Sequence, residues 1–209
     1  MQARAGTNSG MRLFVAIVLP PAVVAAVAAR VDPLRPAWPS LRWASPDAWH
    51  LTLAFLGEVP DPVRPGLEHR LERAAGRHPA LDLAVTGGGT FPGPARARVV
   101  WAGIQADQGA LQKLAGSVAA GARRAGAPPP DEGRRYRPHI TLARLREPAD
   151  VRPLAAGLAG LAGPPWTATE IQLIRSEPGG PGRGPEYTAL AAWPLTGKAQ
   201  FRRAPRRLD

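Results

Sequence analysis

Two histidines begin almost the same tetrapeptide at distant positions of this 209-residue chain. His50 opens the sequence HLTL and His139 opens the sequence HITL, so a threonine follows each histidine by two residues. Side chains alternate between the faces of a β-strand, and residues i and i+2 therefore share a face. If both segments are strands, each presents an imidazole beside a hydroxyl and turns its aliphatic residues to the opposite, buried face.

This set of groups fits phosphodiester chemistry. In-line displacement at phosphorus needs a base beside the attacking oxygen and an acid beside the leaving oxygen. Histidine titrates near neutral pH, so one ring can be neutral while the other is protonated. Thr52 and Thr141 can donate hydrogen bonds to the non-bridging oxygens and orient the phosphate. We therefore predict that His50 and His139 are a catalytic acid–base pair, although these residues alone do not tell the acid from the base.

A metal site is the chemical alternative for two histidines. No Asp, Glu or Cys lies near either motif at the spacing of a catalytic zinc site, and the chain contains no cysteine. A histidine on a strand is also commonly structural, but packing does not require the same polar pair twice. We expect an enzyme without a metal and without a cofactor.

The elements that must position these residues follow a repeated pattern. The first unit has a strand at 12–19, a helix at 21–31 and a β-rich segment at 49–56; the second has a strand at 98–105, a helix at 107–124 and a strand at 137–145. Between and after these units we expect helices at 63–78 and 150–161 and strands at 81–91, 167–175 and 186–193. Two related units pack as lobes around a groove. The pattern predicts a bilobal α+β fold of two antiparallel-dominated sheets with flanking helices, related by a pseudo-twofold duplication.

The composition indicates a basic globular protein. At 44% hydrophobic and 21% charged residues the chain has the balance of a folded domain, and no apolar run is long enough to span a bilayer. We expect a disordered tail at 1–10, a single bilobal catalytic domain at 11–197 and a basic tail at 198–209, in a cytoplasmic monomer. The net charge of +11 attracts polyanions such as RNA, although a GC-rich coding bias accounts for much of the arginine.

The motifs and their surroundings resemble a known family. The segments HLTLAFLG at 50–57 and HITLARL at 139–145 resemble the paired His-x-Thr-x motifs of the two-histidine phosphoesterases. With RLFVAI near the start and RVVWAG at 98–103, the chain is similar over about residues 11–195 to RNA 2′,3′-cyclic phosphodiesterases, also called 2′-5′ RNA ligases. The resemblance implies hydrolysis of RNA 2′,3′-cyclic phosphate ends to 2′-phosphates, with 2′-5′ ligation as the reverse reaction.

The resemblance also implies roles for single residues. His50 is the expected proton donor to the leaving 3′ oxygen, and His139 the expected acceptor of the proton of water. Arg144 is expected to neutralise the phosphate, but strict strand alternation puts it on the face opposite His139. Further candidates for RNA contact, each with an ordinary structural interpretation beside it, are Phe14 and Tyr136 as stacking rings and Arg98 and Arg137 as phosphate ligands.

Two other functions are compatible with the same motifs. One is hydrolysis of a small cyclic nucleotide such as ADP-ribose 1″,2″-cyclic phosphate. The other is a non-catalytic RNA-binding module of the same fold, which would not need both histidines and both threonines. We favour RNA ends, for example those of tRNA halves, as the substrate.

Overall fold

The computed structural model describes residues 10–130, 135–180 and 184–198. The strands of this described part are β1 (Gly10–Val18), β2 (Arg42–Trp43), β3 (His50–Pro60), β4 (Leu81–Phe91), β5 (Ala97–Gln105), β6 (His139–Ala149), β7 (Trp166–Ala168), β8 (Glu170–Glu177) and β9 (Glu186–Pro194). Its α-helices are α1 (Pro21–Val31), α2 (Arg64–Ala75), α3 (Gln108–Arg124) and α4 (Arg152–Leu158), and its short 3₁₀ segments are η1 (Asp32–Ala37), η2 (Pro46–Ala48), η3 (Asp61–Val63) and η4 (Pro94–Arg96). The expected tails lie outside the described residues except for Gly10, which starts β1, and Lys198.

The helices begin where capping residues and prolines allow. The Asp107 side chain accepts hydrogen bonds from the backbone N–H groups of Gly109 and Ala110 at 2.9 and 3.1 Å and is the N-cap of α3. Pro21 starts α1, where its fixed φ suits the first helical position. No helix of the described residues is long and apolar enough to cross a bilayer.

Two helices are shorter than predicted. The helix expected at 63–78 runs only from Arg64 to Ala75, because η3 precedes it and Gly76 caps it. The helix expected at 150–161 spans only Arg152–Leu158. The Asp150 side chain accepts a hydrogen bond from the backbone N–H of Arg152, which delays the start of α4 by two residues.

The strands form one antiparallel sheet with a narrow junction in its middle. Their order is β7-β4-β5-β6-β3-β1-β8-β9, with β2 added beside β6. The halves on either side of the junction meet at a single paired position, Leu51 opposite Ile140. The α+β fold with antiparallel strands is therefore confirmed, and this pair joins the two expected sheets into one.

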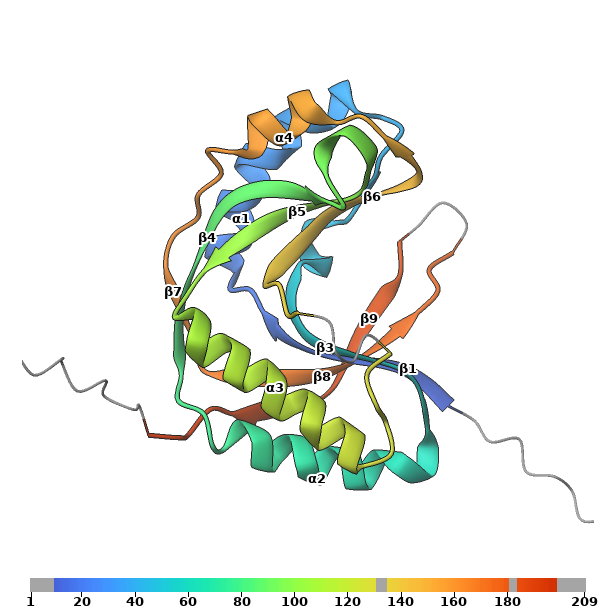
Figure 1. The fold of residues 1–209 in the computed structure, drawn as a ribbon, viewed down its shortest axis with the longest axis vertical. Helices are drawn as coiled ribbons and strands as arrows, with labels where there is room; N and C mark the ends of the chain where they lie inside the picture. Colours follow the sequence, from blue (N-terminus) through green and yellow to red (C-terminus); the bar gives the residue numbers. More distant parts are fainter. Residues whose placement is uncertain (1–9, 131–134, 181–183, 199–209) are drawn as a thin grey trace, which may run out of the picture.

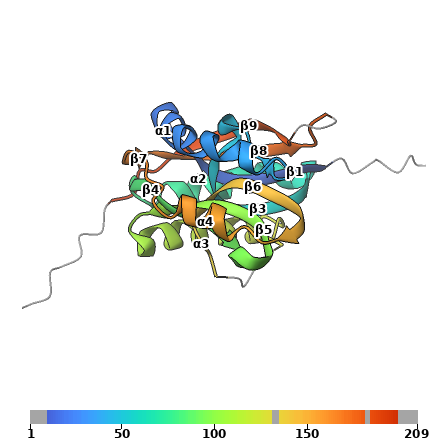
Figure 2. The same ribbon diagram turned by 90° about the horizontal axis from the view of Figure 1, so that it is seen from above.

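The two units of the repeat exchange elements across the junction. β4 follows the first unit in sequence but pairs with β5 of the second, and β8 follows the second unit but pairs with β1 of the first. The helix α3 likewise packs against α2 and β3. Figure 1 shows α1 and α4 at one end of the molecule and α2 and α3 at the other, and in Figure 2 the strands lie between α1 and α3. Each lobe is thus built from both halves of the chain.

The sheet separates a large core from the face that carries the polar motifs. The aliphatic residues of both motifs are fully or almost fully buried in the main core: Leu51, Leu53, Ile140 and Leu142. Phe14, Ala16 and Ile174 form a second, small buried cluster apart from that core. In the pairing of β1 with β3, Ala16 lies opposite Thr52, so this cluster belongs to the face of the threonine.

Candidate active site

The junction between β3 and β6 brings the two motifs together. When the antiparallel pairing of Leu51 with Ile140 is continued by one residue in each direction, His50 faces Thr141 and Thr52 faces His139. Directly opposed residues lie about 5 Å apart and diagonal ones about 7–8 Å apart on one face of such a pair. The histidines therefore occupy one diagonal of a square and the threonines the other. A phosphate placed over the centre is within reach of all four side chains.

A β-bulge turns Arg144 towards the same face. In the pairing of β5 with β6, Trp101 lies opposite Thr141 and Val100 opposite Ala143, so Leu142 is an extra residue without a counterpart. Leu142 and Ala143 are consequently both buried, and Arg144 is exposed. The extra residue reverses the alternation that had placed Arg144 on the wrong face.

The first motif contains a bulge at the equivalent place. Along β1, Ala16 pairs with Thr52 and Val15 with Ala54, which leaves Leu53 as the extra residue of β3. The repeat therefore extends beyond the tetrapeptides to HLTLAF and HITLAR, in which Phe55 takes the place of Arg144. One half of the site has an exposed aromatic ring where the other has a guanidinium.

Both imidazoles are held by the same backbone contact. His50 Nδ1 lies 2.8 Å from the carbonyl oxygen of Ala48, and His139 Nδ1 lies 2.7 Å from that of Arg137. A carbonyl oxygen only accepts, so Nδ1 is the protonated, donating nitrogen in each ring. Nε2 is then the nitrogen that accepts a proton in a neutral ring and donates one in a charged ring.

Burial controls the charge of both rings. It lowers the pKa of His50 from 6.5 to about 4; the hydrogen bond to Ala48 opposes this fall, and the charges of Arg144 and His139 add to it. Burial also lowers the pKa of His139, against its hydrogen bond to Arg137 and together with the charge of Arg144. Both rings are therefore neutral in the free protein near pH 7. An anion bound between them raises both pKa values, because opposite charge favours the protonated form.

Aromatic side chains surround the histidines. The ring of Phe14 lies 4.6 Å from that of His50, and Tyr187 from β9 meets His50 edge-on at 5.2 Å. On the other side Phe91 meets His139 edge-on at 5.0 Å. These contacts fix the ring orientations that the backbone hydrogen bonds begin to set.

The structure gives the two predicted stacking rings other roles. Phe14 is only 2% exposed, so it has no open face for an RNA base, and that prediction is corrected: Phe14 supports His50 from below. The Tyr136 hydroxyl donates to the backbone carbonyl of Thr52 at 3.0 Å, and burial raises its pKa. Tyr136 thereby ties the segment before β6 to β3, directly behind the first threonine.

The two predicted phosphate ligands lie at different distances from the junction. The guanidinium of Arg137 is exposed and lies 5.8 Å from the centre of the Phe91 ring, which in turn contacts His139. Arg98 is exposed and donates to the backbone carbonyl of Arg146 at 3.4 Å, which places it farther along β6 than Arg144. The structure therefore puts Arg137 nearer to the histidines than Arg98.

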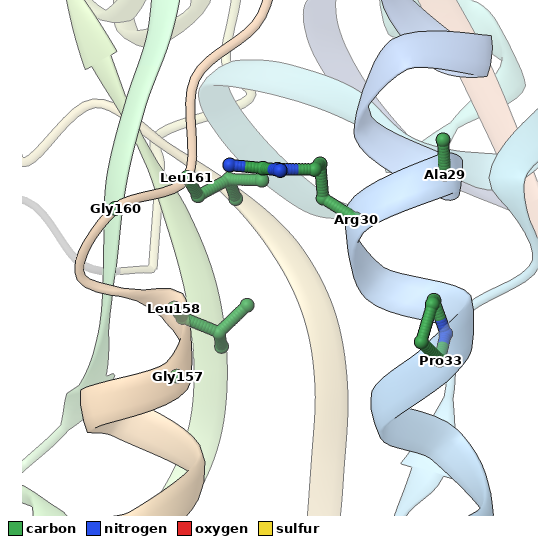
Figure 3. Close-up of a pocket in the computed structure, with 7 residues that line it drawn as sticks. All are labelled: Ala29, Arg30, Pro33, Gly157, Leu158, Gly160 and Leu161. Atoms are coloured by element: carbon green, nitrogen blue, oxygen red, sulfur yellow. The ribbon is translucent and has the colours of Figure 1, made fainter.

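Two hollows of the described surface lie away from the histidines. One, of about 350 Å³, lies between α1 with η1 and the end of α4, and Figure 3 shows Arg30 reaching across it towards Leu161. The other, of about 600 Å³, lies beside α2 and α3 and includes His78, whose ring contacts the Ser117 hydroxyl at 2.8 Å. Within the described residues, no three His, Cys, Asp or Glu side chains gather closely enough to hold a metal ion.

Sequence reasoning missed three aromatic residues around the motifs: Phe55, Tyr187 and Phe91. Phe55 could have been found by aligning the repeat two residues further, since it matches Arg144. Tyr187 carries no such signal. It follows a segment rich in glycine and proline and reaches His50 only because β9 folds back along β8.

Comparison with known proteins places this geometry in a family. The model of the 2′-5′ RNA ligase superfamily matches residues 21–180. An RNA 2′,3′-cyclic phosphodiesterase of Thermus thermophilus is 34% identical over 198 residues, which cover 90% of this chain and 92% of that protein. A crystal structure of a Thermus thermophilus protein superposes with a TM-score of 0.77 at 31% identity, covering 90% of this chain and all of that one. The apo structure of Escherichia coli LigT gives a TM-score of 0.72 at 29% identity, with 90% and 99% covered.

Proposed function

Because this chain belongs to the 2′-5′ RNA ligase superfamily, we propose that it hydrolyses RNA 2′,3′-cyclic phosphate ends to 2′-phosphates, with His50 and His139 as acid and base. The observation that carries the proposal is the diagonal placement of the two imidazoles across the pairing of Leu51 with Ile140. In each ring Nδ1 donates a hydrogen bond to a backbone carbonyl, so Nε2 is the nitrogen that would transfer the proton. The names of the relatives support RNA as the substrate class.

The reaction then proceeds by in-line attack on phosphorus. His139 Nε2 removes a proton from water as the water oxygen forms its bond to phosphorus. The bond from phosphorus to the 3′ oxygen breaks on the opposite side, and protonated His50 gives its proton to that oxygen. The product is a 2′-phosphate with a free 3′ hydroxyl. Each proton transfer of this kind contributes about 10²–10⁴-fold to the rate.

The remaining polar groups of the site bind and orient the phosphate. The hydroxyls of Thr52 and Thr141 occupy the other diagonal of the square and donate to the two non-bridging oxygens. Arg144 supplies the positive charge that the bulge in β6 turns towards them. These contacts neutralise and orient the group at phosphorus, so we expect the reaction to need no metal ion.

The acid and base roles depend on the bound substrate. Burial lowers the pKa of His50 to about 4, so in the free protein His50 does not hold the proton that it has to donate. The negative charge of the cyclic phosphate raises this pKa on binding, so that the ring becomes protonated. Binding and protonation of His50 are thus coupled, and binding takes up a proton near neutral pH.

A product assay on a synthetic RNA with a 2′,3′-cyclic end tests the function. The wild type is expected to yield only the 2′-phosphate, also in the presence of EDTA. His50→Ala and His139→Ala are expected to lower kcat by about 10²–10⁴-fold with an unchanged circular dichroism spectrum. A wild type that leaves the cyclic end intact or opens it to a 3′-phosphate contradicts the proposal.

A second substrate separates the acid from the base. When sulfur replaces the 3′ bridging oxygen, the leaving thiolate does not need a proton. Such a substrate is expected to restore most of the activity of His50→Ala and little of the activity of His139→Ala. The opposite pattern would exchange the two roles.

A further inference from the structure

The exposed large apolar side chains of the described residues gather on one side of His50. They are Val18, Phe55 and Tyr187, with 45%, 40% and 37% of their surface exposed. Val18 lies opposite His50 in the pairing of β1 with β3, and Tyr187 meets the His50 ring at 5.2 Å. Single exposed apolar residues need no explanation, but a cluster beside a reactive centre indicates a binding surface.

A buried aromatic ring, Phe14, packs against the residues of this apolar surface. Phe14 contacts His50 at 4.6 Å, Tyr187 edge-on at 5.2 Å and Phe55 at 6.1 Å between ring centres. It belongs with Ala16 and Ile174 to the small cluster on the face of the motifs, apart from the main core. The two exposed rings are thus held in place before a ligand arrives, so that little conformational entropy is lost on binding.

The other half of the site carries guanidinium groups in addition to the Phe91 ring beside His139. At the position equivalent to Phe55 it carries Arg144, whose charge acts on both histidines. Beside His139 it carries Arg137, whose guanidinium lies over Phe91. The exposed aromatic rings therefore lie on the His50 side and Arg137 lies on the His139 side, while the charge of Arg144 acts on both histidines and on Tyr187.

We infer that Phe55 and Tyr187 form the binding site of the nucleobase of the terminal nucleotide, while its cyclic phosphate lies between the two histidines. A nucleoside cyclic phosphate fits this arrangement, with a flat base for the two exposed rings and an anion for the groups around the histidines. In this orientation the ribose and its leaving 3′ oxygen lie on the side of His50. The inference rests on the proposed function and adds to it the direction in which the substrate binds.

The inference also predicts which terminal nucleobases the site accepts. Stacking on aromatic rings tolerates every base, because each base has a π-face. The site is therefore expected to accept all four terminal nucleotides, with purines favoured through their larger area. Loss of one stacking ring weakens binding of a base by about 5- to 100-fold.

The test compares adenosine 2′,3′-cyclic phosphate with the 2,3-cyclic phosphate of 1-O-methylribose, which has no base. The quantity measured is the ratio of kcat/KM for the two substrates. Phe55→Ala and Tyr187→Ala are each expected to lower this ratio by about 5-fold or more, mainly through KM for the adenosine substrate. Because Tyr187 touches His50, its loss can also slow the chemical step, but that effect is common to both substrates and cancels in the ratio.

The conservative variants Phe55→Tyr and Tyr187→Phe keep a ring and are expected to keep the ratio within about 2-fold of the wild type. The inference is overturned if the alanine variants lose activity equally on both substrates, or if the ring-preserving variants behave like the alanine ones.

Binding of the products separates this inference from the proposed function. Calorimetry with adenosine 2′-phosphate and 1-O-methylribose 2-phosphate needs no turnover. A wild type that leaves the cyclic end of an RNA intact and hydrolyses neither small cyclic phosphate contradicts the proposed function. If the same wild type prefers the adenosine product and the alanine variants lose that preference, the nucleobase site stands on its own; if it shows no preference, the inference fails as well.

Discussion

At the level of single side chains, burial of His50 and its proposed role as an acid favour opposite protonation states of the ring. Burial stabilises the neutral ring, whereas the proton transfer proposed for His50 requires the charged one. The backbone contact of Nδ1 with Ala48 and the ring contacts of Phe14 and Tyr187 keep the imidazole in place in either state. In the proposed reaction, the negative charge of the bound substrate raises the pKa of His50.

The buried neutral ring predicts how stability depends on pH. The pKa of His50 is about 4 in the folded chain and 6.5 in the unfolded chain, so the unfolded state binds the proton more readily. The stability contributed by the neutral ring is complete above pH 6.5 and is lost as the pH falls towards 4. In His50→Gln this loss, about 3 kcal/mol, is expected to disappear.

Urea unfolding of both proteins between about pH 7 and about pH 4 measures the difference. His69→Gln, which changes an exposed histidine on α2, is the matched control and is expected to unfold like the wild type at each pH. Equal pH dependence of the wild type and His50→Gln contradicts the prediction.

Arg144 is expected to act on both histidines and on the phosphate. Its charge lowers the pKa of His50 and of His139, so Arg144→Ala is expected to raise both, as seen by NMR titration of the rings. The variant is also expected to lower kcat/KM by about 10- to 100-fold, and Arg144→Lys by less, because lysine keeps the charge without the fork of donors. Arg146→Ala removes an equal charge farther along β6; an equal loss there would attribute the effect to net charge alone.

At the level of elements, the matching bulges are what the sequence could not predict. Alternation along a strand correctly grouped His50 with Thr52 and His139 with Thr141, since each pair precedes its bulge. It failed for Arg144 because an extra residue is defined only by the partner strand, here β5. The same limit applies to Phe14, whose burial depends on Tyr187 and Phe55 from other parts of the sheet.

The junction of β3 with β6 depends on more than its single backbone pair. The Tyr136 hydroxyl also donates a hydrogen bond to the backbone carbonyl of Thr52, next to the paired Leu51. Tyr136→Phe leaves the carbonyl without this donor and is expected to lower the free energy of unfolding by about 1–2 kcal/mol. Chemical denaturation measures the effect, with Tyr187→Phe as the control at an exposed tyrosine, expected to change stability by less than about 0.5 kcal/mol. Equal effects of the two variants would remove the special role of Tyr136.

At the level of the whole molecule, charge predicts how RNA length affects recognition. The chain carries a net charge of +11, and each phosphate neutralised on an RNA releases counterions on binding. KM for an RNA of about 20 nucleotides is expected to rise about 10-fold or more between 50 and 200 mM salt, whereas KM for adenosine 2′,3′-cyclic phosphate changes far less. Steady-state kinetics at several salt concentrations measures both. Parallel salt dependence of the two substrates would restrict recognition to the terminal nucleotide.

The exchange of β4 and β8 makes the two repeats inseparable. A chain cut between Phe91 and Ala97 yields two fragments. The first contains β1 but lacks its partner β8, and the second contains β5 but lacks its partner β4. Neither fragment encodes a lobe, although each encodes one complete His-x-Thr motif. A single repeat could therefore complete this sheet arrangement only by pairing with a second copy of itself.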